Sequence, residues 1–299
     1  PTTNTSLAPN PQMPLDLDLT PDVLKYLAQL PAPARTKLLE EIGRQEWDKC
    51  ASDPMYWIDQ SRHALPYVYT RDPKQLYTCK GCSDGNTYTF DSRIRHLQIR
   101  HEWEPDRLDV LTSYDFDEHF DGLPTTRPFT LFPYIEPIVK TWLREKILFI
   151  EKSRDMMITW LTVTLYTWDT LFHKNRENIF QSDDSSKALD LVERAHFIWD
   201  NQPAFLKNVH PVSFSHGQTR GGILKVPDLK SVIYGFPAGP DQIRQFHPSG
   251  CFQDEAAFQA EAEAAFTAIK PAIQAGGRFT AVSSANAGWF HRCVKDVIA

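Results

Sequence analysis

The sequence predicts an α/β fold, in which a mostly parallel sheet carries helices on both faces beside a helical N-terminal region and a small insert. Three observations predict it. After about residue 131, short apolar segments of strand length alternate with helical segments, which is the pattern of a parallel sheet. Residues 21–50 carry apolar side chains at helical spacing. Two cysteines and two histidines are grouped within residues 79–101.

Composition bounds the class of protein. The 299 residues allow one large domain, or a core domain with a small satellite, and the hydrophobic fraction of 41% is ordinary for a globular chain. The net charge of −6 argues against a general basic coat for nucleic acid but leaves a local basic patch open. We find neither a membrane-spanning apolar run nor a secretory signal pattern. The odd number of cysteines, five, favours a reducing compartment over a disulfide scaffold.

Composition shifts divide the chain into five parts. We expect a disordered or extended tail (1–20), an N-terminal helical subdomain (21–70) broken at Pro31–Pro33, an insert (71–104), a connection (105–130) and an α/β core (131–299). Within the core, helices are expected at Ile135–Arg144, 158–172, 185–200 and 256–273. Strands are expected at 146–151, 177–182, 251–254 and 278–286, with a hairpin over 221–237.

A phosphate-binding loop is the first candidate site. Residues 146–160 read as strand, loop and helix, the context in which backbone N–H groups at a helix N-terminus face an anion. The common GxxxxGK[ST] pattern is absent, because Met157 and Ile158 occupy its Gly-Lys positions, while Thr159 keeps the place of the magnesium-binding hydroxyl. Lys152 stands at the start of the loop. By itself, the loop is equally compatible with a plain strand–loop–helix connection.

The segment EKSRDMMITW resembles the deviant Walker A loop of tailed-phage terminase large subunits, in which the lysine is displaced to the start of the loop and an arginine follows. The resemblance implies a P-loop NTPase core of the RecA/ASCE-like type, with ATP and Mg²⁺ as ligands. It implies that Lys152 contacts the β and γ phosphates, that Arg154 supports the γ phosphate, and that Thr159 coordinates Mg²⁺. Ser153 is assigned to the same nucleotide-binding loop.

Such a loop predicts a later strand that ends in two acidic residues, and the segment CFQDE (251–255) is a strand of this kind. Asp254 would hold Mg²⁺, and Glu255 would orient and deprotonate the attacking water, because phosphoryl transfer depends on positioning and charge stabilisation. Gln253 interrupts the apolar strand, which is a departure from the pattern.

Three further features rest on the resemblance. Arg244, eleven residues before Glu255, matches an arginine finger that reaches a neighbouring subunit's nucleotide; the alternative is a surface arginine paired with Asp241 or with DNA. FTAVSSANAG matches the motif that couples hydrolysis to movement. FPYIEPIVKTWL occupies the place of the adenine-recognition segment but lacks an obvious glutamine. Ser283, Ser284 and Asn286 are assigned to coupling. Tyr134 is assigned to adenine recognition.

The insert predicts a structural zinc site. Cys79 and Cys82 form a CxxC pair, thirteen residues separate Cys82 from His96, and four separate His96 from His101. This spacing matches the two-Cys, two-His arrangement of a zinc finger, and four ligands complete a closed tetrahedral site. The alternative is a buried cysteine pair with surface histidines. The module could contact DNA, contact another subunit, or only hold a loop.

Together these features predict the ATPase motor domain of a terminase large subunit. The resemblance implies that the chain moves double-stranded DNA into a procapsid. The resemblance implies a homo-oligomeric ring, a portal protein and a small terminase subunit as partners, and a place in the host cytoplasm on procapsids. No acid cluster of a C-terminal nuclease is seen, so we expect that domain, and its cleavage activity, to be absent from these residues. The alternatives are another P-loop translocase or helicase-like ATPase, or a zinc-stabilised nucleic-acid-binding module with an inactive nucleotide fold.

Overall fold

The computed structural model describes residues 21–59, 66–69, 76–82, 85–88, 90–102, 120–122, 126–216 and 221–296. The expected tail, residues 1–20, lies outside the described residues. The chain forms two compact units: one combines residues 1–65 with 131–299, and the other comprises residues 66–130.

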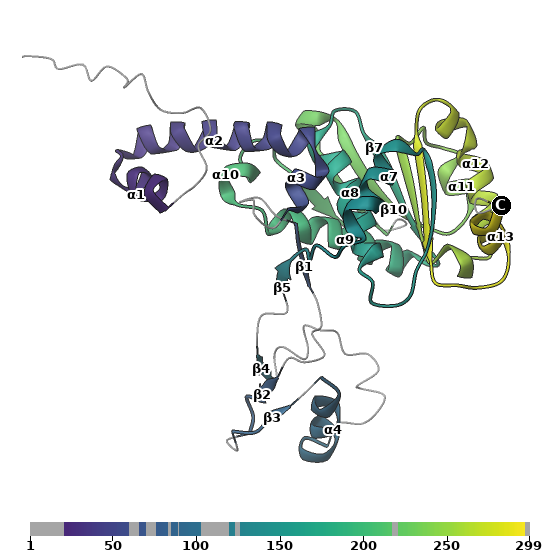
Figure 1. The fold of residues 1–299 in the computed structure, drawn as a ribbon, viewed down its shortest axis with the longest axis horizontal. Coiled ribbons are helices and arrows are strands. Elements are labelled where there is room, and N and C mark those ends of the chain that lie inside the picture. The colour runs from purple at the N-terminus through teal and green to yellow at the C-terminus, as the bar shows by residue number, and fades with distance from the viewer. Residues whose placement is uncertain are drawn as a thin grey trace, which may run out of the picture. The chain divides into compact units, whose positions relative to one another are not determined.

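The larger unit is built on a seven-stranded sheet of order β6-β12-β11-β7-β10-β9-β8 (Figure 1). The first five strands in this order are parallel, while β9 pairs antiparallel with both β10 and β8. The hairpin expected over 221–237 is therefore confirmed as β9 and β10. The strand bounds are β6 Ile147–Glu151, β7 Glu177–Ser182, β8 Ser213–Ser215, β9 Gly222–Val226, β10 Ser231–Pro237, β11 Gly250–Asp254 and β12 Arg278–Ser283.

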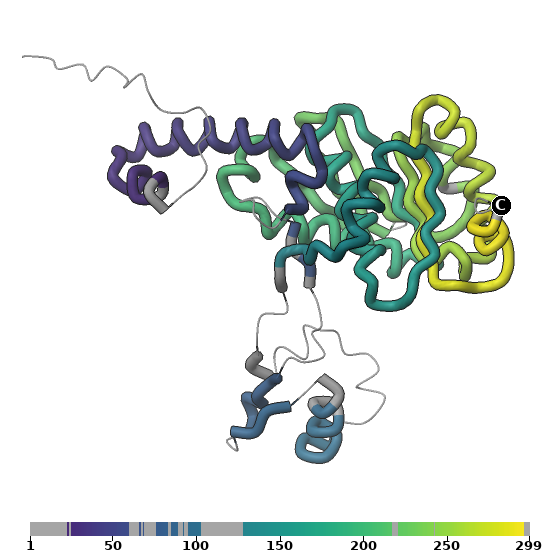
Figure 2. The backbone as a smooth tube through the Cα atoms, in the orientation of Figure 1, coloured from purple at the N-terminus to yellow at the C-terminus, as the bar shows by residue number. Residues whose placement is uncertain are grey.

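Helices cover both faces of this sheet, as the alternating pattern predicts (Figures 1 and 2). On one face, Tyr166 of α8 lies against Phe180 and Phe252, with ring centroids 6.0 and 6.1 Å away. On the other face, Ile179 and Cys251 join an apolar cluster with α12. The principal helices are α7 Ile135–Arg144, α8 Ile158–Phe172, α9 Ser185–Asp200, α12 Ala262–Gln274 and α13 Trp289–Asp296; the short α10 spans Ala204–Lys207 and α11 spans Pro240–Ile243.

The N-terminal helices dock on this core by aromatic packing. They are α1 Pro21–Gln29, α2 Ala32–Ser52 and α3 Pro54–Ile58, so the expected break at Pro31–Pro33 is confirmed. The ring of Trp47 lies 4.6 Å from that of Phe172, and the Trp57 indole N–H donates to Gln202 Oε1 at 3.1 Å. Across the described residues, none of the helices has the length and apolarity needed to cross a membrane.

One expected helix, 256–273, is wrong in its first part. The chain instead forms a 3₁₀ turn, η2 (Ala256–Phe258), and α12 begins only at Ala262. Glu255 adopts a left-handed backbone with φ 51°, and the Gln259 side chain donates to Asp254 O at 2.6 Å. These local contacts close a turn directly after β11, and α12 begins only beyond that turn.

The smaller unit holds two small antiparallel sheets and one helix. β1 (Tyr67–Tyr69) pairs with β5 (Thr126–Pro128), and β2 (Tyr77–Cys79) pairs with both β3 (Thr87–Tyr88) and β4 (Phe120–Gly122). The helix α4 spans Phe90–Arg100. β4 and β5 fall in the range expected to be a connection, so part of that range belongs to the sheets of this unit.

Candidate functional site

The strand order brings three chain segments to one edge of the sheet. β12 lies between β6 and β11, and all three strands are parallel. Their carboxyl ends therefore meet at one edge, the usual place for ligands in open α/β sheets. The Lys152 N–H donates to Ser283 O at 3.0 Å, so the loop after β6 is tied to the end of β12.

Lys152 and Glu255 form an ion pair at this edge. Lys152 Nζ lies 2.7 Å from Glu255 Oε1, and 11% of the lysine side chain and 38% of the glutamate side chain are exposed. The second oxygen, Glu255 Oε2, accepts the Ser284 N–H at 3.1 Å and the Ser283 hydroxyl at 3.3 Å. Burial by itself would raise the pKa of Glu255, but the hydrogen bonds from Lys152, Ser284 and Ser283 outweigh it and hold this pKa below its usual value.

Thr159 and Asp254 form a second pair beside the first. The Thr159 hydroxyl, in the first turn of α8, donates to Asp254 Oδ1 at 2.8 Å. Burial raises the pKa of Asp254, and the Thr159 hydroxyl and the positive charge of Arg194 only partly oppose this. Arg194 lies on α9, and its guanidinium carbon is 5.2 Å from the centroid of the Trp160 ring. No local sequence signal marks Arg194, because its nearness to Asp254 comes from the packing of α9 on the sheet.

The backbone at this edge is strained. Asp155 (φ 61°), Met157 (φ 57°) and Glu255 (φ 51°) all have left-handed conformations that favour glycine. Each costs on the order of 1–3 kcal/mol, and such costs concentrate at functional sites. The loop therefore has a backbone that glycines usually supply, although it has none. Met157 is the N-cap of α8, so the first N–H groups of that helix face the loop.

Three further residues assigned to nucleotide binding belong to the loop after β6 or contact it. Ser153 and Arg154 are exposed. The Tyr134 hydroxyl donates to Met156 O at 2.9 Å, and its ring stacks on Phe132 with centroids 5.4 Å apart. Tyr134 therefore contacts the loop itself, and burial raises its pKa.

The polar tip after β12 contacts the acidic segment. The Ser283 hydroxyl accepts the Ala257 N–H at 3.1 Å, and the Asn286 amide donates to Ala257 O at 3.1 Å. With the Ser283 and Ser284 bonds to Glu255, all three residues assigned to coupling contact residues 255–257. A displacement of Glu255 would therefore act directly on this tip.

Arg244 is not brought into the cluster. Its Nη1 donates to Asp241 Oδ1 at 2.9 Å, with 65% and 82% of the two side chains exposed. The surface pairing with Asp241 is thus observed. In the part of the chain that the structure describes, no contact joins Arg244 to Lys152, Asp254 or Glu255.

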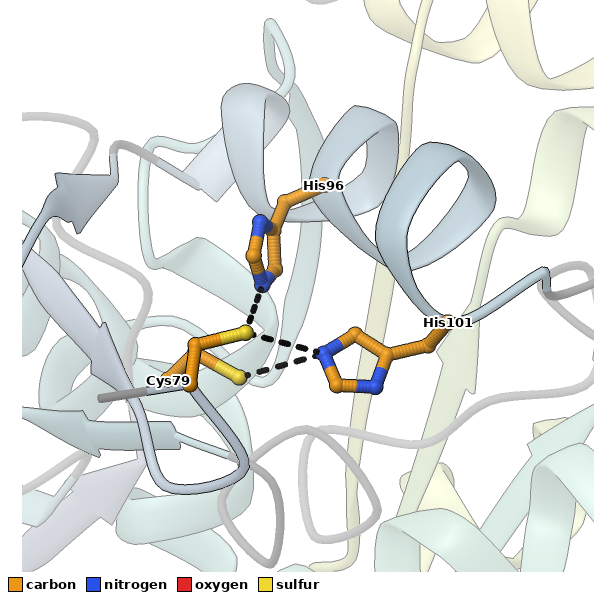
Figure 3. Close-up of side chains that lie close together, drawn as sticks. Cys79, His96 and His101 are labelled. Atoms are coloured by element: carbon orange, nitrogen blue, oxygen red, sulfur yellow. Dashed lines mark hydrogen bonds between the residues drawn. The ribbon is translucent and has the colours of Figure 1, made fainter. Parts of the chain in front are cut away.

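The smaller unit carries a separate cluster of metal-ligating atoms (Figure 3). One ligand atom from each of Cys79, Cys82, His96 and His101 lies within 4.8 Å of the others. Cys79 Sγ is 3.3 Å from His101 Nε2, and Cys82 Sγ is 3.5 Å from both His96 Nε2 and His101 Nε2. In a tetrahedral zinc site, the sulfur–nitrogen edge is about 3.5 Å for Zn–S and Zn–N bonds of about 2.3 and 2.0–2.1 Å. The donor set and its spacing fit zinc.

The local structure explains how these four side chains meet. Cys79 ends β2, and Cys82 follows in a tight turn in which the Cys82 N–H donates to Cys79 O at 3.3 Å. His96 lies on α4, and His101 directly follows that helix. A Cβ at Gly81 would lie 3.1 Å from the His101 ring, so the turn favours glycine. Tyr88 lies 4.2 Å from the His96 ring, and Leu97 is buried. The side chains of Phe90 and Ile94, two other apolar residues of this segment, lie outside the described part of the structure.

Comparison with known proteins finds similarity among solved structures alone. No protein-family profile and no curated protein sequence matches the chain. The ATPase domain of the Thermus phage P74-26 large terminase is 12% identical, with a TM-score of 0.39, over 55% of this chain and 69% of that one. The HK97 bacteriophage large terminase is 12% identical, with a TM-score of 0.47, over 57% of this chain. The large terminase of a thermophilic bacteriophage, in complex with ADP, is 13% identical, with a TM-score of 0.34, over 51% of this chain.

These values concern the path of the chain alone. The matched part spans 37% of the HK97 protein and 39% of the ADP-bound terminase. Independently of them, the sheet order, the strained loop between β6 and α8 and the acids after β11 describe a P-loop fold.

Proposed function

We propose that this chain is the ATP-hydrolysing motor domain of a viral terminase large subunit. The observation that carries the proposal is the meeting of two pairs at one sheet edge, Lys152 with Glu255 and Thr159 with Asp254. A cation for phosphates, a hydroxyl and a carboxylate for a metal, and a second carboxylate for water are the groups that phosphoryl transfer requires.

The loop after β6 binds the triphosphate of ATP. Lys152 contacts the β and γ phosphates, with Arg154 supporting the γ phosphate and Ser153 contributing from the same loop. The N-terminus of α8 adds its unpaired N–H groups and its dipole. Tyr134, which already touches the loop through Met156, lies on the adenine side.

Thr159 and Asp254 are the residues that would hold Mg²⁺. Their oxygens are 2.8 Å apart, and hydroxyl and carboxylate oxygens are the ligands Mg²⁺ prefers. When bound, the ion neutralises charge on the phosphates. The raised pKa of Asp254 fits this role, because a buried carboxylate without a cation is unfavourable. Glu255, whose pKa is lowered, stays ionised and accepts a proton from the attacking water.

Arg244 completes the site from a neighbouring subunit in a ring. Its side chain is exposed and its guanidinium pairs with the exposed Asp241, so it is accessible to a partner. Ser283, Ser284 and Asn286 transmit the state of Glu255 to the segment beyond β12. The movement that follows is packaging of double-stranded DNA into a procapsid in the host cytoplasm, with a portal protein and a small terminase subunit as partners.

We propose Zn²⁺ as a structural ion held by Cys79, Cys82, His96 and His101. A four-ligand site is closed and leaves no position for substrate, so the ion stabilises the smaller unit and takes no part in hydrolysis.

The test is ATP hydrolysis by the full chain with and without double-stranded DNA. The proposal predicts DNA-stimulated turnover that is lost in Lys152→Ala and in Glu255→Gln. Full DNA-stimulated activity in both variants would reject it. A nucleotide-binding titration separates the motor from an inactive nucleotide fold, which would bind no ATP. Stimulation by single-stranded DNA with strand separation would favour a helicase-like ATPase.

A further inference from the structure

Two glutamines lie side by side inside the sheet, and one of them directly precedes Asp254 and Glu255. Gln181 of β7 and Gln253 of β11 are partners in the parallel register, and both side chains are fully buried. Two residues earlier, their neighbours Ile179 and Cys251 belong to the apolar cluster beneath α12. An apolar row of the sheet therefore ends in two amides. Buried amides are retained only where they find hydrogen-bond partners.

The two amides form a directed hydrogen-bonded chain. Gln253 Nε2 donates to Gln181 Oε1 at 3.1 Å and to Ala262 O at 3.5 Å. Gln181 Nε2 donates to Gly239 O at 3.0 Å and to Pro237 O at 3.4 Å. Because Gln181 Nε2 donates to two carbonyls, Gln181 Oε1 faces Gln253 and accepts from its NH₂ group, which also donates to Ala262 O. These partners fix the orientation of each amide. The chain runs from the start of α12, across β11 and β7, to Gly239.

Gly239 is the start of the segment that carries Arg244. It is the N-cap of α11, and Arg244 is the C-cap of that four-residue helix. Its φ of 133° favours glycine, and an added Cβ would lie 2.9 Å from Glu261 Oε2. The chain at the start of α11 is thus held at its N-cap, where Gln181 donates to the Gly239 carbonyl.

Gln253 faces away from the candidate nucleotide site. Neighbouring residues of a strand point to opposite faces, and Asp254 meets Thr159 on the α8 side. Gln253 is consequently on the α12 side, where it cannot touch substrate. The end of β11 therefore carries the Asp254 carboxylate on one face of the sheet. On the other face it carries the hydrogen-bonded amides that lead to α11.

We propose that Gln253 and Gln181 are positioning residues that set the Arg244-bearing helix α11 relative to the Asp254–Glu255 end of β11. This rests on the proposed ATPase function and deepens it. The glutamine pair acts through Arg244, which completes the nucleotide site of a neighbouring subunit. Gln253 Oε1 has no hydrogen-bond partner within the described residues. The pair therefore carries an unsatisfied acceptor that an apolar pair would avoid.

The test is the double substitution Gln181→Met with Gln253→Met in the full chain. Methionine keeps length and removes the polar atoms, so we expect the melting temperature to be unchanged or higher, since removing both partners of a buried bond is near neutral. We expect KM for ATP within about twofold and kcat lower by about 10- to 100-fold, the range that a misplaced catalytic group produces. Gln202→Met, which removes another buried and hydrogen-bonded amide, is the matched control and should leave kcat unchanged.

Combination with Arg244→Ala distinguishes positioning from a general structural effect. If the glutamines act through Arg244, the double-methionine change lowers kcat by less than about twofold in the Arg244→Ala background, because residues that act as a unit are non-additive. The same loss of kcat in both backgrounds overturns the inference while ATPase activity stands. A normal kcat in the double-methionine variant, or in Arg244→Ala alone, also overturns the inference.

A wild-type chain without ATPase activity rejects the proposed function, and the anchoring is then judged from hydrogen–deuterium exchange. Faster exchange over residues 239–246 in the double-methionine variant, but not in Gln202→Met, supports the anchoring. Unchanged exchange overturns it.

Discussion

Lys152 and Glu255 are 103 residues apart in the chain, yet Lys152 Nζ lies 2.7 Å from Glu255 Oε1. The lysine belongs to the loop after β6 and the glutamate to the turn after β11, with β12 between the two strands. The pair joins the group proposed to bind phosphate with the group proposed to activate water. Phosphates that compete for Lys152 would free Glu255, so binding and the chemical step are linked through this contact.

Substitution of the two partners should separate binding from chemistry. Glu255→Gln keeps the size and hydrogen-bonding capacity of the side chain but replaces its charged carboxylate with a neutral amide. We therefore expect nucleotide affinity to remain while kcat falls by about 10²–10⁴-fold, the range for loss of a general base. Lys152→Ala removes the phosphate contact and should weaken nucleotide binding as well. Fluorescent-nucleotide titration and steady-state ATPase assays measure the two effects. Lys174→Ala, an exposed lysine between α8 and β7, is the control and should behave as wild type.

Loss of the Ser283 hydroxyl should change the pH dependence of hydrolysis. Ser283 donates to Glu255 Oε2 and helps to hold the pKa of Glu255 down. In Ser283→Ala, that pKa rises, so the acidic limb of the kcat/KM profile moves to higher pH. Ser52→Ala, which removes an exposed hydroxyl bonded to Lys49 O, should leave the profile in place. An unchanged acidic limb in Ser283→Ala would contradict Glu255 as the base.

The buried carboxylate of Asp254 should make stability depend on pH. Its pKa is raised in the folded chain, so its contribution to stability is fully present below the unfolded pKa of about 3.9 and is lost as pH rises through the folded pKa. At neutral pH and without Mg²⁺, Asp254→Asn should therefore unfold at a higher temperature than wild type, and the difference should shrink as pH falls through the folded pKa. Thermal unfolding at a series of pH values in EDTA measures this.

The same variant reports on the metal. Mg²⁺ with a non-hydrolysable ATP analogue should stabilise the wild type, because a ligand bound only to the folded state raises the unfolding temperature. It should stabilise Asp254→Asn much less. Equal stabilisation of both proteins would exclude Asp254 as a magnesium ligand.

Arg244 should act between subunits. Arg244→Ala should lose about 10³–10⁵-fold in kcat, the range for an arginine finger, while nucleotide affinity is kept. Mixing it with Glu255→Gln should restore part of the activity, because a Glu255→Gln subunit offers its Arg244 to the intact site of its neighbour. A mixture no more active than its components would place Arg244 outside the reaction. Arg144→Ala, an exposed arginine on α7, is the control for surface charge.

The smaller unit should contain about one zinc per chain, the number that its one four-ligand set predicts. Elemental analysis of the purified protein measures it. Cys79→Ser and His101→Ala should lose the metal and make residues 66–130 sensitive to protease, whereas ATP binding by the larger unit is retained. Cys293→Ser, on α13, should keep full zinc content. A metal-free wild type with a protease-resistant 66–130 unit would refute the site.

The sequence by itself determined the features that depend on neighbours along the chain. Hydrophobic periodicity is local, so the helices at 135–144, 158–172 and 185–200 and the strand at 177–182 agree with the structure at both ends. The four cysteines and histidines proposed to hold zinc fall within 23 consecutive residues, and their spacing alone predicted the cluster that the structure brings together. The loop and the acids were recognisable because strand–loop–helix order is also local.

Tertiary structure decided what depends on register and packing. Only the strand order shows that Lys152 reaches Glu255, and only the packing of α9 on the sheet shows that Arg194 lies near Asp254. Gln253 interrupts an apolar strand in the sequence, and its partner Gln181 is known only once β7 and β11 are aligned. The left-handed backbone of Glu255 lies directly before the 3₁₀ turn that replaces the first part of the expected helix, and contacts across that turn hold the Glu255 side chain. Such contacts join residues far apart in the chain, and no local pattern encodes them.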